Sequence, residues 1–228
     1  MPFLTLKDAN DAKLSTPIIH TLKKRILHWE YPPDYLLTEK DLCREFSVSR
    51  SPVREALRVL EASRLVHKKN TQGYLVKQLG LAEIVELYDF RLAIELFAVE
   101  VVTTNKAHFE TILALRKEWV ECELTTKSNM ELAKIDEQFH EALMALTSNA
   151  TLLLALQQVN GRLFIFRMID FEQRERIETT YEQHLAILNA ILVSDVPRAK
   201  ENLRKNIAQA RDYVHIAVRD LLVRSHEL

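Results

Sequence analysis

Hydrophobic residues recur every three to four positions along most of this chain, which predicts a protein built mainly of α-helices. From Leu81 onward, polar or helix-breaking stretches divide this pattern into six helix-length segments. They cover approximately residues 81–104, 106–126, 129–147, 150–170, 173–194 and 196–225. Consecutive helices with short connections are typical of an antiparallel bundle, so we expect a six-helix bundle as a second domain over residues 79–228.

Residues 1–78 show a different pattern, which predicts a first domain of three helices and a hairpin. The polar residues 1–14 predict a loose arm, and Pro17 fits the first turn of a helix that follows it. Thr38 and Ser49 are suitable N-caps for two further short helices. Two strand-like segments around a polar turn at residues 70–73 follow, so the order of elements predicts a winged helix-turn-helix.

The helix that begins at Ser49 has two chemically different sides. Val53, Ala56, Leu57 and Leu60 gather on one side, and Arg50, Arg54 and Arg58 form a basic row away from it. A basic row alone is more often a solvated helix face than a DNA-binding surface. Its place after a short helix and before a hairpin favours a helix that packs with one side and contacts phosphates with the other.

The nine residues from Ser49 to Leu57 read Ser-Arg-Ser-Pro-Val-Arg-Glu-Ala-Leu. This run resembles the hallmark of the GntR family of bacterial transcription factors, and the resemblance covers about residues 17–76. It implies a winged helix-turn-helix that binds double-stranded DNA. Carried over by position, it implies operator contacts from Lys40, Ser49, Arg50, Ser51 and Arg54, and from Asn70, Thr71 and Gly73 in the wing. Arg44 and Arg58 are either further backbone contacts or plain solvated charges.

The chain departs from the pattern of that family at its turns. Asp34 and Arg64 stand where the family usually has glycine, and Thr71-Gln72 replaces the usual basic residue before Gly73. Glycine at such positions allows a positive φ, which aspartate tolerates better than most residues and arginine adopts only with strain. A positive φ at Arg64 would therefore be strained.

Charge is divided unevenly between the two predicted domains. Residues 1–78 hold 14 basic and 9 acidic residues, a net charge of +5, whereas residues 79–228 hold 17 and 23, a net charge of −6. A basic first half and an acidic second half suit a DNA-binding module joined to a sensing module that does not itself bind DNA.

Several other classes of protein are disfavoured by the sequence. No run of about 18 apolar residues is present, and the start of the chain does not resemble a secretion signal, so we expect a cytoplasmic protein without a membrane partner. Two cysteines, Cys43 and Cys122, are too few for a disulfide framework or a zinc ribbon.

Six polar residues interrupt the apolar sides of the predicted bundle helices. They are Arg91 and Glu95, Asp136 and His140, His184, and Asn206. A buried polar group without a partner costs about 1–3 kcal/mol, so residues from four helices that point into one core are expected to satisfy one another, a metal or a ligand. Taken singly, each is more simply explained as a hydrogen-bonded core residue, and Arg91 with Glu95 as a structural ion pair.

Together these residues resemble the FCD ligand-binding domain of the FadR-type subgroup of GntR regulators. In that domain an aspartate and a histidine four residues apart join two later histidines around a divalent metal. Asp136, His140 and His184 match three of the positions, and Asn206 stands at the fourth. With this domain included, the resemblance spans nearly the whole chain from Pro17.

An amide oxygen is a weaker and harder ligand than imidazole, so Asn206 predicts either a weakened site or no metal. The first alternative is a weakened site for zinc, nickel, manganese or magnesium. In the second, Asn206 hydrogen-bonds an effector directly. The resemblance also implies a small organic acid as effector, with Arg91 placed to pair with its carboxylate and Glu95 beside it.

The function expected from this reading is ligand-controlled DNA binding, most simply repression. A homodimer would present two recognition helices to a near-palindromic operator. One alternative is a metal-free regulator that binds an apolar or acyl effector. A second is a helical-bundle metalloenzyme, suggested by Glu137-x-x-His140, but such sites need that element twice and Tyr181 stands where a glutamate would precede His184. We therefore expect that the chain is not an enzyme.

Overall fold

The computed structural model describes residues 6–27, 30–70, 72–77, 80–123 and 126–225 of the chain. By their internal contacts the residues form two compact units, Met1–Leu79 and Gly80–Leu228.

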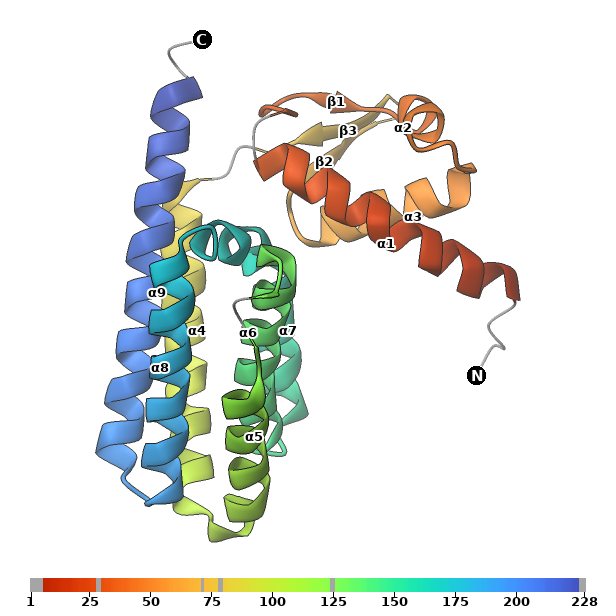
Figure 1. The fold of residues 1–228 in the computed structure, drawn as a ribbon. Helices are drawn as coiled ribbons and strands as arrows, with labels where there is room; N and C mark the ends of the chain where they lie inside the picture. Colours follow the sequence, from red (N-terminus) through yellow and green to blue (C-terminus); the bar gives the residue numbers. More distant parts are fainter. Residues whose placement is uncertain (1–5, 28–29, 71, 78–79, 124–125, 226–228) are drawn as a thin grey trace. The chain divides into compact units, whose positions relative to one another are not determined.

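The first unit is a small helical domain with a three-stranded antiparallel sheet (Figure 1). Its elements are α1 (Leu6–Leu27), β1 (Leu36–Leu37), α2 (Glu39–Phe46), α3 (Arg50–Ala62), β2 (Val66–Lys69) and β3 (Gly73–Val76). The strand order is β1-β3-β2, with Leu36 opposite Leu75 and Val66 opposite Val76. This arrangement confirms the winged helix-turn-helix, with β2 and β3 as the wing; the two-residue strand β1 was not predicted.

The apolar side of α3 forms the centre of this unit. Val53, Ala56, Leu57 and Leu60 are fully buried, and α3 packs against α1, whose Leu22 is also fully buried. The same packing turns Arg50, Arg54 and Arg58 toward solvent. The two sides predicted for this helix are therefore the two sides that the fold uses.

The predicted loose arm is wrong for residues 6–14, because α1 begins at Leu6 and continues through Pro17. Residues 1–5 lie outside the described part of the chain. The segment before the proline contains Leu, Ala and Lys, which favour helix, and this preference extends the helix despite the backbone hydrogen bond that a proline removes. Within the helix, the Thr21 hydroxyl donates to the carbonyl of Pro17.

Two positions where the resembled family usually has glycine adopt a positive φ. Asp34 has φ 64° and Arg64 has φ 54°, although neither is a glycine. Arg64 closes the connection between α3 and β2, where its amide donates to the carbonyl of Glu61. A positive φ at a long side chain is strained, and here the packing of the flanking helix and strand fixes it.

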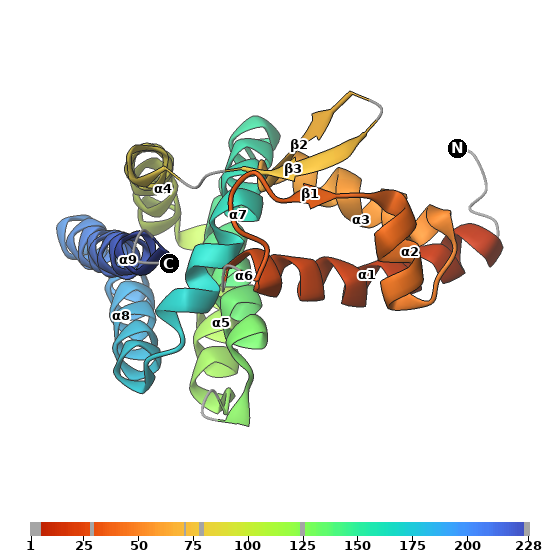
Figure 2. The same ribbon diagram turned by 90° about the horizontal axis from the view of Figure 1, so that it is seen from above.

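The second unit is a bundle of six long helices with one short 3₁₀ turn. Its elements are α4 (Leu81–Thr104), η1 (Lys106–His108), α5 (Phe109–Glu121), α6 (Asn129–Ala145), α7 (Ala150–Asp170), α8 (Arg174–Leu192) and α9 (Val196–Ser225). Figure 2, which looks nearly along the helix axes, shows α9 flanked by α4 and α8, and α5, α6 and α7 in a second layer. This confirms the predicted six-helix bundle. The segment predicted over residues 106–126 is divided into η1 and a shorter α5.

Within the described part of the chain, no helix is both long enough and apolar enough to cross a membrane.

Helix α6 begins with a complete capping box, which fixes where its later residues point. The Ser128 hydroxyl accepts a hydrogen bond from the amide of Glu131, and the Glu131 carboxylate accepts from the amide of Ser128. Asp136 and His140 lie two and three turns further along this helix. The cap therefore defines the start of the helix that carries part of the buried polar site.

We expect Ser128→Ala to lower the free energy of unfolding of the helical unit by about 1 kcal/mol, because the Glu131 amide loses its acceptor and the Glu131 carboxylate loses the hydroxyl that donates to it. Urea unfolding followed by circular dichroism measures this change. Gln138→Ala, at an exposed position in the middle of the same helix, is the matched control and should change stability by less than about 0.5 kcal/mol. Equal effects of the two substitutions would contradict the role given to the cap.

Candidate functional site

A hollow of about 430 Å³ lies in the first unit among α2, α3 and the wing. Its lining consists of Thr38, Glu39, Lys40, Arg50, Arg54, Lys68, Asn70, Gln72, Gly73 and Tyr74. Four of these side chains are basic and one is acidic. A concave, positively charged surface beside an exposed helix is suited to a phosphate backbone.

The structure brings five of the predicted DNA-binding residues together in this hollow: Lys40, Arg50, Arg54, Asn70 and Gly73. The other described residues of that prediction, Arg44, Ser49, Ser51 and Arg58, are exposed outside its lining, and Thr71 lies outside the described residues. The sequence reading missed Lys68, which lies on β2 opposite Tyr74 of β3. The signal was present, because the strand that leads into the wing tip carries two consecutive lysines.

The start of α3 differs in one respect from the predicted cap. Ser49 has the extended backbone of an N-cap, with φ −70° and ψ 172°, but its side chain makes no capping hydrogen bond. Its hydroxyl is exposed at the end of the helix where the first-turn amides point. Such helix starts favour anions through these amides and the helix dipole, so this end of α3 is suited to a phosphate oxygen.

Arg54 is held in place by a residue of the preceding helix. Its Nε lies 2.9 and 3.0 Å from the two carboxylate oxygens of Glu39, while half of the side chain stays exposed. This ion pair joins α2 to α3 across the turn. It orients the guanidinium without removing it from solvent, which reduces the entropy that a DNA contact would otherwise lose.

The second unit contains a buried group of three potential metal ligands, Asp136 and His140 of α6 and His184 of α8. One ligand atom from each residue lies within 4.8 Å of the others. Asp136 Oδ1 is 3.4 Å from His184 Nε2 and 3.7 Å from His140 Nε2. The residues are 7%, 1% and 0% exposed, so three polar side chains converge at one point that solvent does not reach.

Two arginines and a glutamate orient this group. His140 Nδ1 is 2.5 Å from Glu95 Oε2, and Glu95 Oε1 accepts a hydrogen bond from Arg91 Nε at 2.5 Å. Arg167 Nε donates to Asp136 Oδ2 at 2.7 Å. These hydrogen bonds leave His140 Nε2 and Asp136 Oδ1 facing each other. Carboxylates commonly orient the histidines of metal sites in the same way.

Three groups of the site have lowered pKa values, two because of neighbouring charges and one because of burial. Burial alone would raise the pKa of the Asp136 carboxyl, but the charges of His140 and Arg167 outweigh it and hold that pKa well below its usual range. Burial also acts on Glu95, whose pKa is nevertheless lowered to about 2 by Arg91 and His140. For His184, burial lowers the pKa well below its usual value. Its imidazole is therefore neutral, the form that binds metals.

Aromatic rings enclose His184 on two sides. The ring of Phe139 is stacked on it with centroids 3.7 Å apart, and the Trp119 ring lies 4.6 Å away at 51°. The Trp119 indole N–H donates to the backbone carbonyl of Tyr181, which fixes its position. Packed rings exclude water and hold the imidazole in one orientation.

Several nitrogen atoms at this site have no hydrogen-bond partner among the described residues. They are Nε2 of His140 and both ring nitrogens of His184. Leaving a buried polar atom unpaired costs about 1–3 kcal/mol, which a bound ion or ligand would offset. The donor set of one carboxylate and two imidazoles, with these unpaired atoms, fits a divalent metal that accepts nitrogen and oxygen ligands.

The remaining predicted residues are buried nearby. Asn206 of α9 is 3% exposed, and its Nδ2 donates to Gln183 Oε1 at 3.0 Å. Arg91 and Glu95 are each 2% exposed and paired with each other. The sequence reading missed Arg167 and Asn160, which are joined by a 2.8 Å hydrogen bond and lie two turns apart on α7. Both interrupt an apolar helix side, so the criterion applied to the other helices would have found them.

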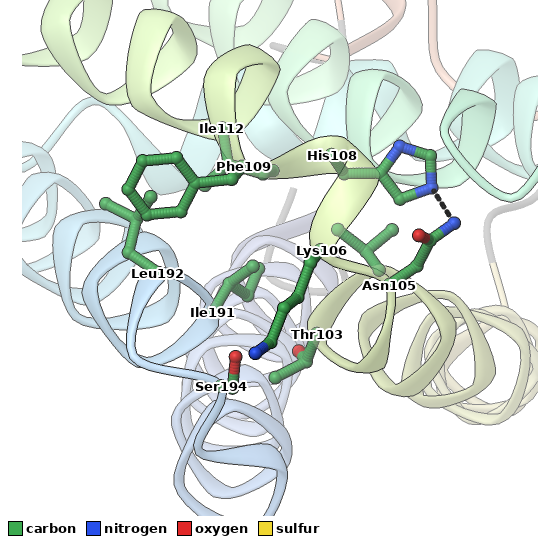
Figure 3. A pocket seen from close by; sticks show the side chains of 10 residues that line it. Thr103, Asn105, Lys106, His108, Phe109, Ile112, Ile191, Leu192 and Ser194 are labelled. Atoms are coloured by element: carbon green, nitrogen blue, oxygen red, sulfur yellow. Dashed lines mark hydrogen bonds between the residues drawn. The ribbon is translucent and has the colours of Figure 1, made fainter.

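Another cavity of the helical unit lies near η1 and the end of α8 (Figure 3). Figure 3 shows the side chains of Lys106, Thr103 and Ser194 gathered at one side of it. Its volume is about 30 Å³, which is the space of a single water molecule. This cavity is too small for a metabolite, so the buried polar group remains the candidate site.

Two domain families match this chain. The family described as "Bacterial regulatory proteins, gntR family" matches residues 14–76, and the FCD domain matches residues 86–209. The HTH-type transcriptional regulator YdhC of Bacillus subtilis (strain 168) is 29% identical over 203 residues, which cover 85% of this chain and 90% of that protein. A gluconate operon transcriptional repressor of Bacillus licheniformis is 28% identical over 206 residues, which cover 88% and 83%.

Solved structures show the same fold at lower identity. The chain of Lar, which controls the expression of the Listeria monocytogenes agr system, matches with a TM-score of 0.65 and 19% identity over 94% of this chain and 99% of its own. A GntR family member from Pseudomonas syringae pv. tomato matches with a TM-score of 0.52 and 22% identity over 93% and 89%. At these identities the likeness concerns the fold alone.

We expect Arg167→Leu to destabilise the helical unit by about 3 kcal/mol, because it leaves the Asp136 carboxylate buried without its cation. Urea unfolding of metal-free protein measures the change, and adding Asp136→Asn should recover part of it. The control is Arg174→Leu, which breaks the exposed pair with Glu178 and should change stability by less than about 1 kcal/mol. If Arg167→Leu were as mild as this control, the ion pair would not be a structural requirement.

Proposed function

We propose that this chain, which belongs to the GntR family of bacterial regulatory proteins and carries an FCD domain, represses transcription until a small organic acid binds its helical unit. The chain is a transcriptional regulator, as its two domain families and its relatives are, which confirms that it is not an enzyme. Repression is proposed because the similar gluconate operon protein is a repressor. Since the chromosome is the target, we propose the cytoplasm as its location.

The DNA-binding half of the proposal rests on the basic hollow of the first unit. Arg50 and Arg54 on α3, together with Lys40 on α2, would face a major groove of the operator. Arginine reads guanine bidentately, whereas the Ser49 and Ser51 hydroxyls and the first-turn amides of α3 suit phosphate. Asn70 and Gly73 would contact DNA from the wing, and Arg44 and Arg58 would add backbone contacts.

We propose in addition that the chain binds a near-palindromic operator as a homodimer. One helix-turn-helix covers about half of a typical operator, and two related by two-fold symmetry reach successive major grooves. The uneven division of charge supports this arrangement, because only the basic first unit is attracted to DNA.

The sensing half rests on one observation, the convergence of three buried ligand atoms whose nitrogens lack partners. We propose that Asp136, His140 and His184 hold a divalent metal, with the amide of Asn206 as a weak fourth ligand or as an effector contact. Two imidazoles favour zinc or nickel over manganese or magnesium. When bound, the metal would act as a Lewis acid toward a carboxylate oxygen of the effector.

Around the metal, the residues of this chain would position the effector. Glu95 holds the His140 ring through Nδ1, and Arg167 holds Asp136 through Oδ2. Arg91, anchored on Glu95, would pair with the effector carboxylate. An effector bound among α4, α6, α7 and α8 would favour one arrangement of the helices and thereby change operator affinity through differential binding.

The metal-free alternative with an apolar or acyl effector finds less support in this site. Asp136, Glu95, Arg91 and Arg167 are charged and at most 7% exposed. An acyl chain placed against them would desolvate these charges without supplying partners, which is unfavourable.

For the DNA-binding surface, we expect Arg50→Ala to weaken operator binding roughly tenfold, because one arginine contact to DNA is lost. Binding to DNA selected from a randomised library, titrated at several salt concentrations, measures this loss. Arg204→Ala, at a half-exposed position of α9, is the control and should leave the affinity unchanged. Wild-type affinity and salt dependence in the Arg50 variant would rule out this surface.

For the metal, we expect about one divalent ion per chain in protein purified without chelator. His140→Ala and His184→Ala should each lower metal affinity by a factor of 100 or more, and Glu95→Gln by about 10–100, since it only orients His140. Elemental analysis and competition with a chromophoric chelator measure these changes. His108→Ala, outside the site, is the control. Equal metal content in all four variants would exclude metal binding at this site.

A further inference from the structure

Five side-chain donors in the helical unit are buried without a hydrogen-bond partner among the described residues, in addition to the histidine nitrogens. One is Nε of Arg162, a half-buried residue that pairs with Glu83 through Nη2. The other four are the Tyr88 hydroxyl, Arg91 Nη2, Arg167 Nη1 and the Thr180 hydroxyl. Each of these four residues is at most 4% exposed. An unpaired buried donor is unfavourable by about 1–3 kcal/mol, so four of them in one bundle call for an acceptor that the chain itself does not supply.

These donors lie on helices that contact or carry the Asp136/His140/His184 group: α4 and α7 pack against α6, and α8 carries His184. Tyr88 and Arg91 are one turn apart on α4, and the Arg91 guanidinium carbon lies 6.0 Å from the centre of the Tyr88 ring. Arg167 is bound to Asp136 through Nε, which leaves Nη1 beside it. Thr180 precedes His184 by one turn of α8. Three helices therefore present donors to the neighbourhood of the proposed metal.

The buried charges of this unit are balanced before any metal is added. Arg91 pairs with Glu95, and Arg167 pairs with Asp136. Arg176 makes a bidentate pair with Asp170 at 2.8 and 3.0 Å. Three buried cations thus meet three carboxylates, and the fourth buried carboxylate, that of Glu137, pairs with the exposed Lys134 at 3.2 Å. A divalent metal adds two positive charges that no buried carboxylate of these pairs offsets, and an uncompensated charge is strongly unfavourable in a protein interior.

We propose that the effector is a dicarboxylate. One carboxylate faces the metal ligands, and the other accepts hydrogen bonds from Tyr88, Arg91, Arg167 and Thr180. Two negative charges neutralise the metal, and the second carboxylate supplies the acceptor that the unpaired donors lack. The inference rests on the proposed function, because it assumes the metal that Asp136, His140 and His184 would hold.

The charge requirement is tested with ligands that differ in one carboxylate. Malonate, succinate and glutarate are titrated into the nickel-loaded full chain by calorimetry, beside propionate, butyrate and valerate, their monocarboxylate counterparts of equal carbon number. At least one dicarboxylate should bind at least tenfold more tightly than its counterpart. The proposal is overturned if no dicarboxylate does so.

The donors are tested with variants that remove a hydroxyl and little else. Tyr88→Phe and Thr180→Val should each weaken binding of the best dicarboxylate about tenfold, while the melting temperature of the unliganded chain stays equal or rises, because an unsatisfied buried hydroxyl is removed. Thr179→Val is the control, at the position next to Thr180. It removes a hydroxyl that donates to the Glu175 carbonyl, and it should leave ligand affinity unchanged. Unchanged ligand affinity in both Tyr88→Phe and Thr180→Val would overturn the assignment of these donors.

Failure of this inference is distinguishable from failure of the proposed function. Metal content and binding to library-selected DNA are measured on the same preparation before any acid is added. A chain that binds neither metal nor DNA contradicts the proposed function. A chain that binds both, but prefers monocarboxylates, contradicts only the dicarboxylate.

Discussion

The buried ion pair between Arg167 and Asp136 is the constraint on which the helical unit depends. A carboxylate that is 7% exposed is tolerated because the guanidinium takes one of its oxygens. The other oxygen, Oδ1, therefore lies near Nε2 of both His140 and His184. Glu95, which pairs with Arg91, binds Nδ1 of His140 and so orients Nε2 of that ring toward Asp136. The ion pairs that allow these charges to be buried also orient the ligand atoms. The stability of the helical unit and the geometry of the site therefore depend on the same interactions.

In the first unit, by contrast, the charged side chains that would contact DNA must stay exposed. The apolar side of α3 is buried against α1, which leaves its arginines in solvent. Glu39 restrains Arg54 without covering it. Neighbouring Lys40 and Lys68 concentrate positive potential in one hollow. The chain therefore combines a unit that uses charge at its surface with a unit that uses charge inside its core.

Sequence periodicity predicted the elements well where packing decides them and less well where backbone details do. The bounds of α4, α7 and α9 agree with the expected segments, because their apolar sides are long. The start of α1 was missed because Pro17 is tolerated inside the helix, and a two-residue strand such as β1 has no readable period. Helical spacing put Asp136, His140 and His184 on inward sides, but distances between helices follow only from tertiary packing. Arg167 was not predicted, although it interrupts the apolar side of α7 as the other site residues interrupt theirs.

The indole of Trp119 has a consequence beyond packing. It lies 4.6 Å from the His184 ring, and it is one of the two tryptophans in the chain. A paramagnetic ion coordinated by that imidazole would stand close enough to quench the emission of this fluorophore. The helical unit thus carries its own optical probe, through which occupancy of the buried centre becomes visible in the intact protein without any label.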